Sequence, residues 1–193
     1  RRERMTGLTI TDLRAGYGKI EVLRELSLSV QPTDYVAVVG ANGAGKTTLL
    51  KSISGTVAVQ GGSLDFDGHD LRTRAAHKIP ALRIAHVPEG RQIFPGLTVL
   101  DNLMAGAWLQ RDRAQRQETI EQVHPLFPRL KARSCRVAGT LSGGEPQVVD
   151  LAGALSARAQ RRLPVSVLDD GLARRRERAV QNRTAPWLVV HHK

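Results

Sequence analysis

The sequence predicts an α/β protein with a mixed core sheet, antiparallel strands at the N-terminus and a helical subdomain. Three observations predict it. Polar and apolar residues alternate near the N-terminus, residues 35–54 give a β-branched run, a glycine-rich loop and a helix, and helical periodicity begins at Thr98. We expect residues 1–193 to form one domain, with the helical subdomain over about residues 98–150.

The predicted strands come first. Leu8–Ile10 and the alternating run Leu26–Val30 flank a glycine turn at residues 16–18, which is typical of an antiparallel meander. Further short strands are predicted at Ser63–Phe66 and Arg83–Val87, because glycines or a proline bound each apolar run.

Two helices are predicted in the subdomain. Thr98 and Asp101 form a start that resembles a capping box, followed by apolar residues at helical spacing. A second helix is expected from about Asp112 to His124, before two prolines.

The glycine-rich loop completes the pattern G-x-x-x-x-G-K-[ST]. Glycines let backbone N–H groups surround a polyphosphate, Lys46 supplies a positive charge to the β and γ phosphates, and the Thr47 hydroxyl can bind Mg²⁺. A buried strand over Tyr35–Val39 and a helix over Leu49–Ser54, ended by Gly55, are the required flanking elements. The candidate nucleotide-binding residues of the loop are Gly40, Ala41, Asn42, Gly43, Ala44, Gly45, Lys46, Thr47 and Thr48.

A second motif, Leu141-Ser142-Gly143-Gly144-Glu145, opens another predicted helix. Ser142 can cap the helix, the two glycines admit an anion, and the helix N-terminus attracts negative charge. Alone this string is a common helix cap. Its occurrence together with the phosphate loop is a far more specific signal of function than either motif by itself.

Composition sets limits. No apolar run is long enough to span a bilayer, and no signal-peptide core follows the first residues. Cys135 is the only cysteine, so an intramolecular disulfide is excluded and a reducing, cytosolic setting is expected.

The net charge of +11 suits nucleotide phosphates, nucleic acid or an anionic membrane face, and much of it lies in residues 158–183. Aromatic residues do not interleave with these arginines, which favours a solvated basic face over single-strand binding.

With both motifs, the chain from about Leu8 to Asp169 resembles an ATP-binding-cassette ATPase. In that family two ATPase subunits enclose ATP between the phosphate loop of one and the Leu-Ser-Gly-Gly signature of the other, here Leu141, Ser142, Gly143, Gly144 and Glu145. The resemblance implies that Tyr17 stacks on adenine.

The subfamily that the chain resembles most is the ATPase of branched-chain amino-acid importers. This rests on Ile84–Val99, Asp101–Leu103, Leu126–Leu130 and Ala138–Gly144. There Glu89 replaces the glutamine with which most cassettes sense the γ-phosphate and Mg²⁺.

The resemblance implies ATP and Mg²⁺ as cofactors, with Thr47, Glu89 and Asp169 around the metal. It implies a second ATPase subunit, two transmembrane permease subunits and an extracytoplasmic substrate-binding protein as partners. The chain would then lie on the cytoplasmic face of the membrane, held by the permeases, and the cargo would be leucine, isoleucine, valine or a related amino acid.

The last quarter departs from the family pattern. Val165–Asp169 fits the strand that ends in the Mg²⁺ ligand, but Asp170 stands where the family has its catalytic Glu. Either Asp170 replaces that group, or a short deletion has removed it. His191 would be the family's switch residue if residues 187–190 form a strand. Pro146 stands where the family has Gln. A fragment, a truncated chain or a decayed paralogue would each explain an incomplete cassette domain.

Three functions follow from this sequence. The favoured one is an ATP-hydrolysing importer subunit. The first alternative is a nucleotide-binding cassette that hydrolyses poorly and acts in regulation or assembly. A soluble cassette that acts on nucleic acid ranks last, since no nucleic-acid-binding motif supports it.

Overall fold

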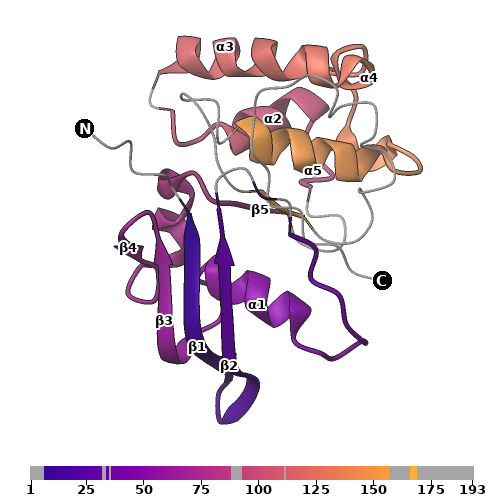
Figure 1. Ribbon diagram of the computed structural model, residues 1–193. Helices are drawn as coiled ribbons and strands as arrows, with labels where there is room; N and C mark the ends of the chain where they lie inside the picture. Colours follow the sequence, from indigo (N-terminus) through magenta and orange to yellow (C-terminus); the bar gives the residue numbers. More distant parts are fainter. Residues whose placement is uncertain are drawn as a thin grey trace. The chain divides into compact units, whose positions relative to one another are not determined.

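The computed structural model describes residues 7–31, 34, 36–87, 93–110, 112–156 and 166–168. These residues fall into two compact units (Figure 1). One runs from Gly7 to His86 and includes residues 166–168, and the other runs from Val87 to Ser156. The α/β class expected from the sequence is confirmed.

The first unit contains a four-stranded antiparallel sheet in the order β2-β1-β3-β4. Its strands are β1 Leu8–Tyr17, β2 Ile20–Val30, β3 Val59–Phe66 and β4 His69–Asp70. The predicted meander is confirmed, and the strands are longer than the sequence indicated. A second sheet pairs β5, Ala85–Val87, with β6, Ser166–Leu168. β5 confirms residues 85–87 of the strand predicted at Arg83–Val87, and β6 confirms residues 166–168 of the strand predicted at Val165–Asp169. Residues 165 and 169 lie outside the described residues.

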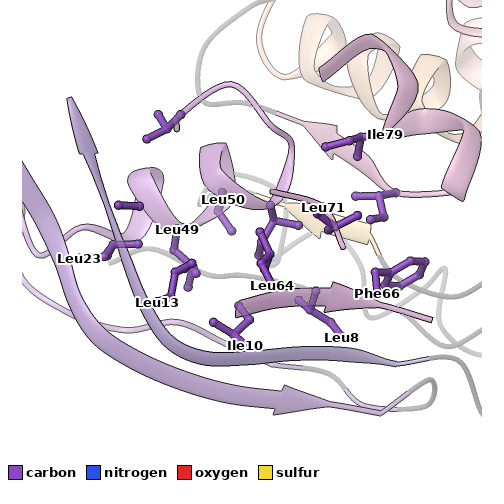
Figure 2. Packing of buried hydrophobic residues seen from close by; sticks show 14 of the residues in the cluster. Leu8, Ile10, Leu13, Leu23, Leu49, Leu50, Leu64, Phe66, Leu71 and Ile79 are labelled. Atoms are coloured by element: carbon purple, nitrogen blue, oxygen red, sulfur yellow. The ribbon is translucent and has the colours of Figure 1, made fainter. Parts of the chain in front are cut away.

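Helix α1, Lys46–Ile53, packs its apolar face on the antiparallel sheet. Figure 2 shows Leu49 and Leu50 of α1 among Leu13 of β1, Leu23 of β2 and Leu64 of β3, all of them buried. Each buried leucine contributes about 1.5–3 kcal/mol relative to an exposed one. This packing fixes the helix, and therefore the loop that precedes it, on the sheet.

The end of α1 confirms the stop predicted at Gly55. The Gly55 N–H donates to the Ser52 carbonyl at 3.1 Å, and the Thr56 N–H donates to the Lys51 carbonyl at 2.8 Å. This pair of bonds forms a Schellman motif, which requires a left-handed residue after the helix, and Gly55 has φ +72°.

The strand predicted at Tyr35–Val39 is wrong for the residues described there. Residues 36–40 have no strand hydrogen bonding in the described part of the chain. Val36 and Val38 pack against the core, whereas the side chain of Val39 is 75% exposed. The segment therefore buries one face only, and a β-branched run does not by itself require burial on both faces.

The second unit is helical. Its helices are α2 Val99–Gly106, α3 Arg113–Val123, α4 Pro128–Lys131 and α5 Glu145–Ser156. Short 3₁₀ turns lie at Ala76–Lys78 and Pro80–Leu82 in the first unit, and at His124–Leu126 and Ala138–Thr140 in the second. Within the described ranges, no helix is both long and apolar enough to cross a bilayer.

Both predicted helix starts in this unit are confirmed. The Thr98 hydroxyl accepts the Asp101 N–H at 3.1 Å, and the Asp101 carboxylate accepts the Thr98 N–H at 3.3 Å, which completes the capping box of α2. Asp112 caps α3 by accepting the Ala114 N–H at 3.1 Å. These caps satisfy backbone donors that the helices leave without partners.

Candidate nucleotide-binding site

The phosphate loop bends tightly between residue 39 and α1. The Ala44 N–H donates to the Ala41 carbonyl at 3.1 Å, and Gly43 and Gly45 have φ of +85° and +91°. A Cβ on Gly45 would lie 2.7 Å from Cδ2 of Leu23 in β2. Glycine is required at position 45 for both reasons, because the backbone is left-handed and the sheet is close.

The N-terminus of α1 leaves its first N–H groups available to an anion. Gly45 is the N-cap and has no side chain to cap the helix, and the first turn contains no acidic residue. An α-helix provides no internal acceptor for its first N–H groups, and its dipole places partial positive charge there. Such a terminus binds phosphate well.

Lys46 is held directly over this loop. Its side chain is only 5% exposed, and Nζ donates to the carbonyls of Gly40 at 2.6 Å and Ala41 at 2.7 Å. The described residues place no carboxylate in an ion pair with this ammonium group. A lysine carries three N–H donors, so these two carbonyls leave one donor for a phosphate oxygen.

The two threonines after Lys46 are placed differently. Thr48 is buried and its carbonyl accepts the Ser52 hydroxyl at 2.9 Å, so it belongs to the helix core. Thr47 is half-buried in the first turn, where its hydroxyl suits a hard cation bound beside a phosphate. Within the described ranges there is no cluster of three His, Cys, Asp or Glu residues for a metal. The other expected Mg²⁺ ligands, Glu89 and Asp169, lie outside those ranges.

Tyr17 ends β1 in the same unit as the phosphate loop. It pairs in register with Ile20, the first residue of β2, and its side chain is 47% exposed. An exposed aromatic ring at a strand end is available to stack on a planar base.

The signature motif belongs to the helical unit. Leu141 is buried, Ser142 and Gly143 are exposed, and Gly143 has φ +63°. Helix α5 begins at Glu145, with Pro146 in its first turn as the sequence indicated. The prediction that Ser142 caps this helix is wrong, because the Glu145 N–H bonds the Ser142 carbonyl at 3.3 Å in a turn and moves the helix start past Ser142.

Glu145 fixes the motif through two contacts that were not predicted, and the S-x-x-E spacing is a signal for the first of them. Its carboxylate accepts the Ser142 N–H at 3.3 Å and forms an ion pair with Arg133. Arg133 lies twelve residues earlier, and no local pattern signals a contact of that span. The turn that presents Ser142 and Gly143 is therefore held by a partly buried charge pair.

Three residues expected to act in catalysis are not among those described. Glu89, Asp170 and His191 all lie outside the described ranges, and their roles stay predictions from the sequence.

Comparison with known proteins identifies the family and confirms the fold. The family model described as "ABC transporter" matches residues 23–171. The chain belongs to the ABC transporter family. The resemblance to ATPases of branched-chain amino-acid importers is also confirmed by similarity to named relatives.

Two relatives and one solved structure define this similarity. The chain is 41% identical over 142 residues to the high-affinity branched-chain amino acid transport ATP-binding protein BraG of Pseudomonas aeruginosa, covering 74% of this chain and 60% of BraG. It is 36% identical over 166 residues to LivF of Archaeoglobus fulgidus, named a probable branched-chain amino acid transport ATP-binding protein, covering 86% of this chain and 68% of LivF. A nucleotide-free ATP-binding cassette from an ABC transporter matches with a TM-score of 0.78 at 23% identity, over 98% of this chain and 82% of that one, and shows the cassette fold.

Proposed function

We propose that this chain is the ATP-binding and ATP-hydrolysing subunit of an ABC importer for branched-chain amino acids. The observation that carries the proposal is the phosphate loop, in which Lys46 Nζ lies on the Gly40 and Ala41 carbonyls beside an uncapped helix N-terminus. That arrangement suits a polyphosphate, and the chain's family uses ATP. Similarity to BraG and LivF supports the cargo.

Each site residue has a proposed task. Residues 40–48 hold the phosphates through backbone N–H groups and Lys46, and Tyr17 stacks on adenine. Thr47, Glu89 and Asp169 hold Mg²⁺, which would neutralise phosphate charge during hydrolysis. Asp170 positions the attacking water, with Glu89 and His191 beside the γ-phosphate. Residues 141–145 contact ATP held by a second ATPase subunit, so the dimer is the active form.

The assembly follows from this function. We propose one cassette domain over residues 1–193, with a helical subdomain over about 98–150 that carries the signature. Two permease subunits would hold the chain on the cytoplasmic face of the membrane, and an extracytoplasmic substrate-binding protein would deliver the cargo. Closure of the ATPase dimer on ATP would drive the permeases from one state to the other.

An exposed apolar patch in the helical unit supports the permease contact. Phe94, Leu97 and Val137 are 57%, 43% and 43% exposed, and we call these three residues the apolar patch. Backbone bonds join the two segments that carry it. Thr98 bridges Val137, and the Ala138 N–H donates to the Leu97 carbonyl at 2.8 Å. Three exposed apolar residues on two joined segments offer apolar surface that a protein partner would cover.

The Lys46→Ala substitution tests nucleotide binding. It removes the buried ammonium that would bond phosphate oxygens, so ATP affinity is expected to fall about a hundredfold, the equivalent of roughly 2–3 kcal/mol for bonds to a charged group. Binding is measured by titration with a fluorescent ATP analogue, and Mg²⁺-dependent ATP turnover is measured in parallel. Lys51→Ala, on the last turn of the same helix, is the matched control and should bind as the parent chain does. Equal affinity in Lys46→Ala and the parent would contradict the proposed site.

Loss of the apolar patch tests the permease contact. The double substitution Leu97→Ser and Val137→Ser is expected to lower leucine uptake by cells that depend on this chain at least tenfold, because two exposed apolar anchors are lost. Nucleotide binding should be unchanged. Ile20→Ser with Leu126→Ser removes two other exposed apolar side chains and serves as the control. If both doubles lower uptake alike, the patch has no special part in the assembly.

A second function rests on one feature of the sequence. Because Asp170 stands in place of the catalytic Glu, a cassette that binds ATP and hydrolyses it poorly is the alternative. Such a chain would act in regulation or assembly.

A further inference from the structure

The basic segment, Pro128–Arg136, concentrates positive charge on the helical unit. It contains Arg129, Lys131, Arg133 and Arg136 and no acidic residue. Elsewhere in the described part of this unit, α3 carries two basic residues, Arg113 and Arg116, followed by two acidic residues, Glu118 and Glu121, so its charges balance. The charge of the basic segment is therefore local and of one sign.

The fold holds this segment in a defined shape. Helix α4 continues into turns, in which the Arg133 N–H donates to the Leu130 carbonyl at 3.0 Å and the Arg136 N–H donates to the Arg133 carbonyl at 2.8 Å. Leu130 is 2% exposed and anchors the segment in the core. Arg129 and Lys131 flank this anchor, and both are exposed.

Only one of the four cations has an acidic partner in the part of the chain that the structure describes. Arg133 pairs with Glu145, and Arg129, Lys131 and Arg136 form no ion pair there. Exposed cations that form no ion pair among the described residues stay available to an external anion. Together these cations attract an anionic partner.

The basic segment is continuous with the apolar patch. Arg136 precedes Val137, and the Arg136 carbonyl accepts the Val99 N–H at 2.9 Å, next to the bridge between Thr98 and Val137. If the apolar patch contacts a permease, then Arg136 lies at the edge of that contact. Lipid headgroups surround any membrane-embedded subunit, and anionic headgroups attract basic segments at the surface.

We propose that the basic segment binds the anionic phospholipid headgroups around the permease, and so helps to hold the subunit on the membrane. The proposal rests on the proposed function, because it takes the chain to be a subunit of a membrane transporter. Single-stranded nucleic acid is the weaker partner for this segment, since Pro128–Arg136 contains no aromatic residue to stack on bases. Duplex DNA is tested directly, as a competitor of the vesicles.

The experiment measures partition of the full chain onto sedimented vesicles, without nucleotide. Vesicles contain phosphatidylcholine alone or mixed with phosphatidylglycerol. The test variant carries Arg129→Gln, Lys131→Gln and Arg136→Gln and leaves the pair between Arg133 and Glu145 intact. The control carries Lys19→Gln, Arg24→Gln and Lys78→Gln, which remove the same charge from exposed positions of the first unit. A charge-preserving variant, Arg129→Lys with Arg136→Lys, checks that a loss of vesicle binding in the test variant comes from the lost charge and not from substitution at these positions.

The parent chain is expected to prefer the anionic vesicles. Each basic residue near the surface contributes about a fivefold factor, so the test variant should partition roughly a hundredfold more weakly, while the control loses at most a few-fold. The charge-preserving variant should bind as the parent does, and added salt should weaken binding steeply.

Three results would overturn the proposal. The first is an equal loss of vesicle binding in the test and control variants. The second is equal binding of the parent chain to neutral and anionic vesicles. The third is displacement of the parent chain from vesicles by duplex DNA, together with a loss of DNA affinity in the test variant that equals its loss of vesicle binding. The last would assign the segment to nucleic acid. A result against the proposed function would look different. In that case Lys46→Ala would leave binding of the ATP analogue unchanged, independently of how the variants partition onto vesicles.

Discussion

Replacing Asp170 with Glu is expected to raise Mg²⁺-dependent ATP turnover about a hundredfold. The proposed function gives Asp170 the task of positioning the attacking water, and the resemblance implies that the family has a Glu at this place after the residue corresponding to Asp169. An Asp side chain is one methylene shorter, which draws the carboxylate back from the attacking water by about 1 Å. Misplacement on that scale can cost on the order of a hundredfold in rate. The measurement is steady-state ATP hydrolysis at concentrations that favour the dimer.

The kinetic constants separate this effect from a change in binding. A water-positioning group acts in the transition state, so Asp170→Glu should raise kcat and leave ATP-analogue affinity unchanged. The double variant with Lys46→Ala should remain at background and serves as the control. Turnover that does not rise would favour the alternative of a nucleotide-binding cassette in regulation or assembly, since the defect would then extend beyond one carboxylate.

The glycine-rich loop was predictable from the sequence, because its pattern specifies residues by their backbone requirements. A loop that surrounds phosphates needs glycines at fixed positions, and Gly43 and Gly45 do adopt left-handed conformations. The contacts of Lys46 could not be predicted in the same way. Its acceptors are the carbonyls of Gly40 and Ala41, and a carbonyl is present at every residue.

The lengths of the strands were predicted incorrectly for a different reason. The sequence indicated a strand at Leu8–Ile10, whereas β1 continues to Tyr17. The pairing of β1 with β2 shifts register between Ile10 and Leu13, and Asp12 there has φ +48°. Such a β-bulge breaks the alternation of buried and exposed residues from which a strand is predicted.

The signature motif shows the limit of local patterns. The helix after the motif was predicted, but its start was not, because the turn before it is fixed by Glu145 and its distant partner Arg133. The strand prediction for residues 36–39 was wrong for a similar reason. Only the fold decides whether other parts of the chain cover one face of the segment or both. Long-range contacts decide such cases, and one sequence does not reveal them.

The contact between α2 and α5 provides the second large effect. Gly106, the last residue of α2, approaches the backbone of Gly153 in α5 so closely that a Cβ on Gly106 would lie 2.2 Å from the Gly153 carbonyl oxygen. Backbone atoms in a packed helix cannot move aside as a flexible side chain can. Gly106→Ala is therefore expected to destabilise the chain by about 3 kcal/mol, at the upper end of ordinary overpacking.

Gly153→Ala is the matched control, because the two glycines face each other but are not equivalent. A Cβ on Gly153 would meet its nearest neighbour, the Asn102 carbonyl oxygen, at 3.8 Å, which is ordinary contact. Alanine in the middle of α5 should instead stabilise the helix by up to about 1 kcal/mol. Urea unfolding followed by circular dichroism measures both variants, with unchanged slopes confirming a change in stability alone. Equal effects of the two substitutions would contradict the close approach at Gly106, since only one of the two Cβ atoms lacks space.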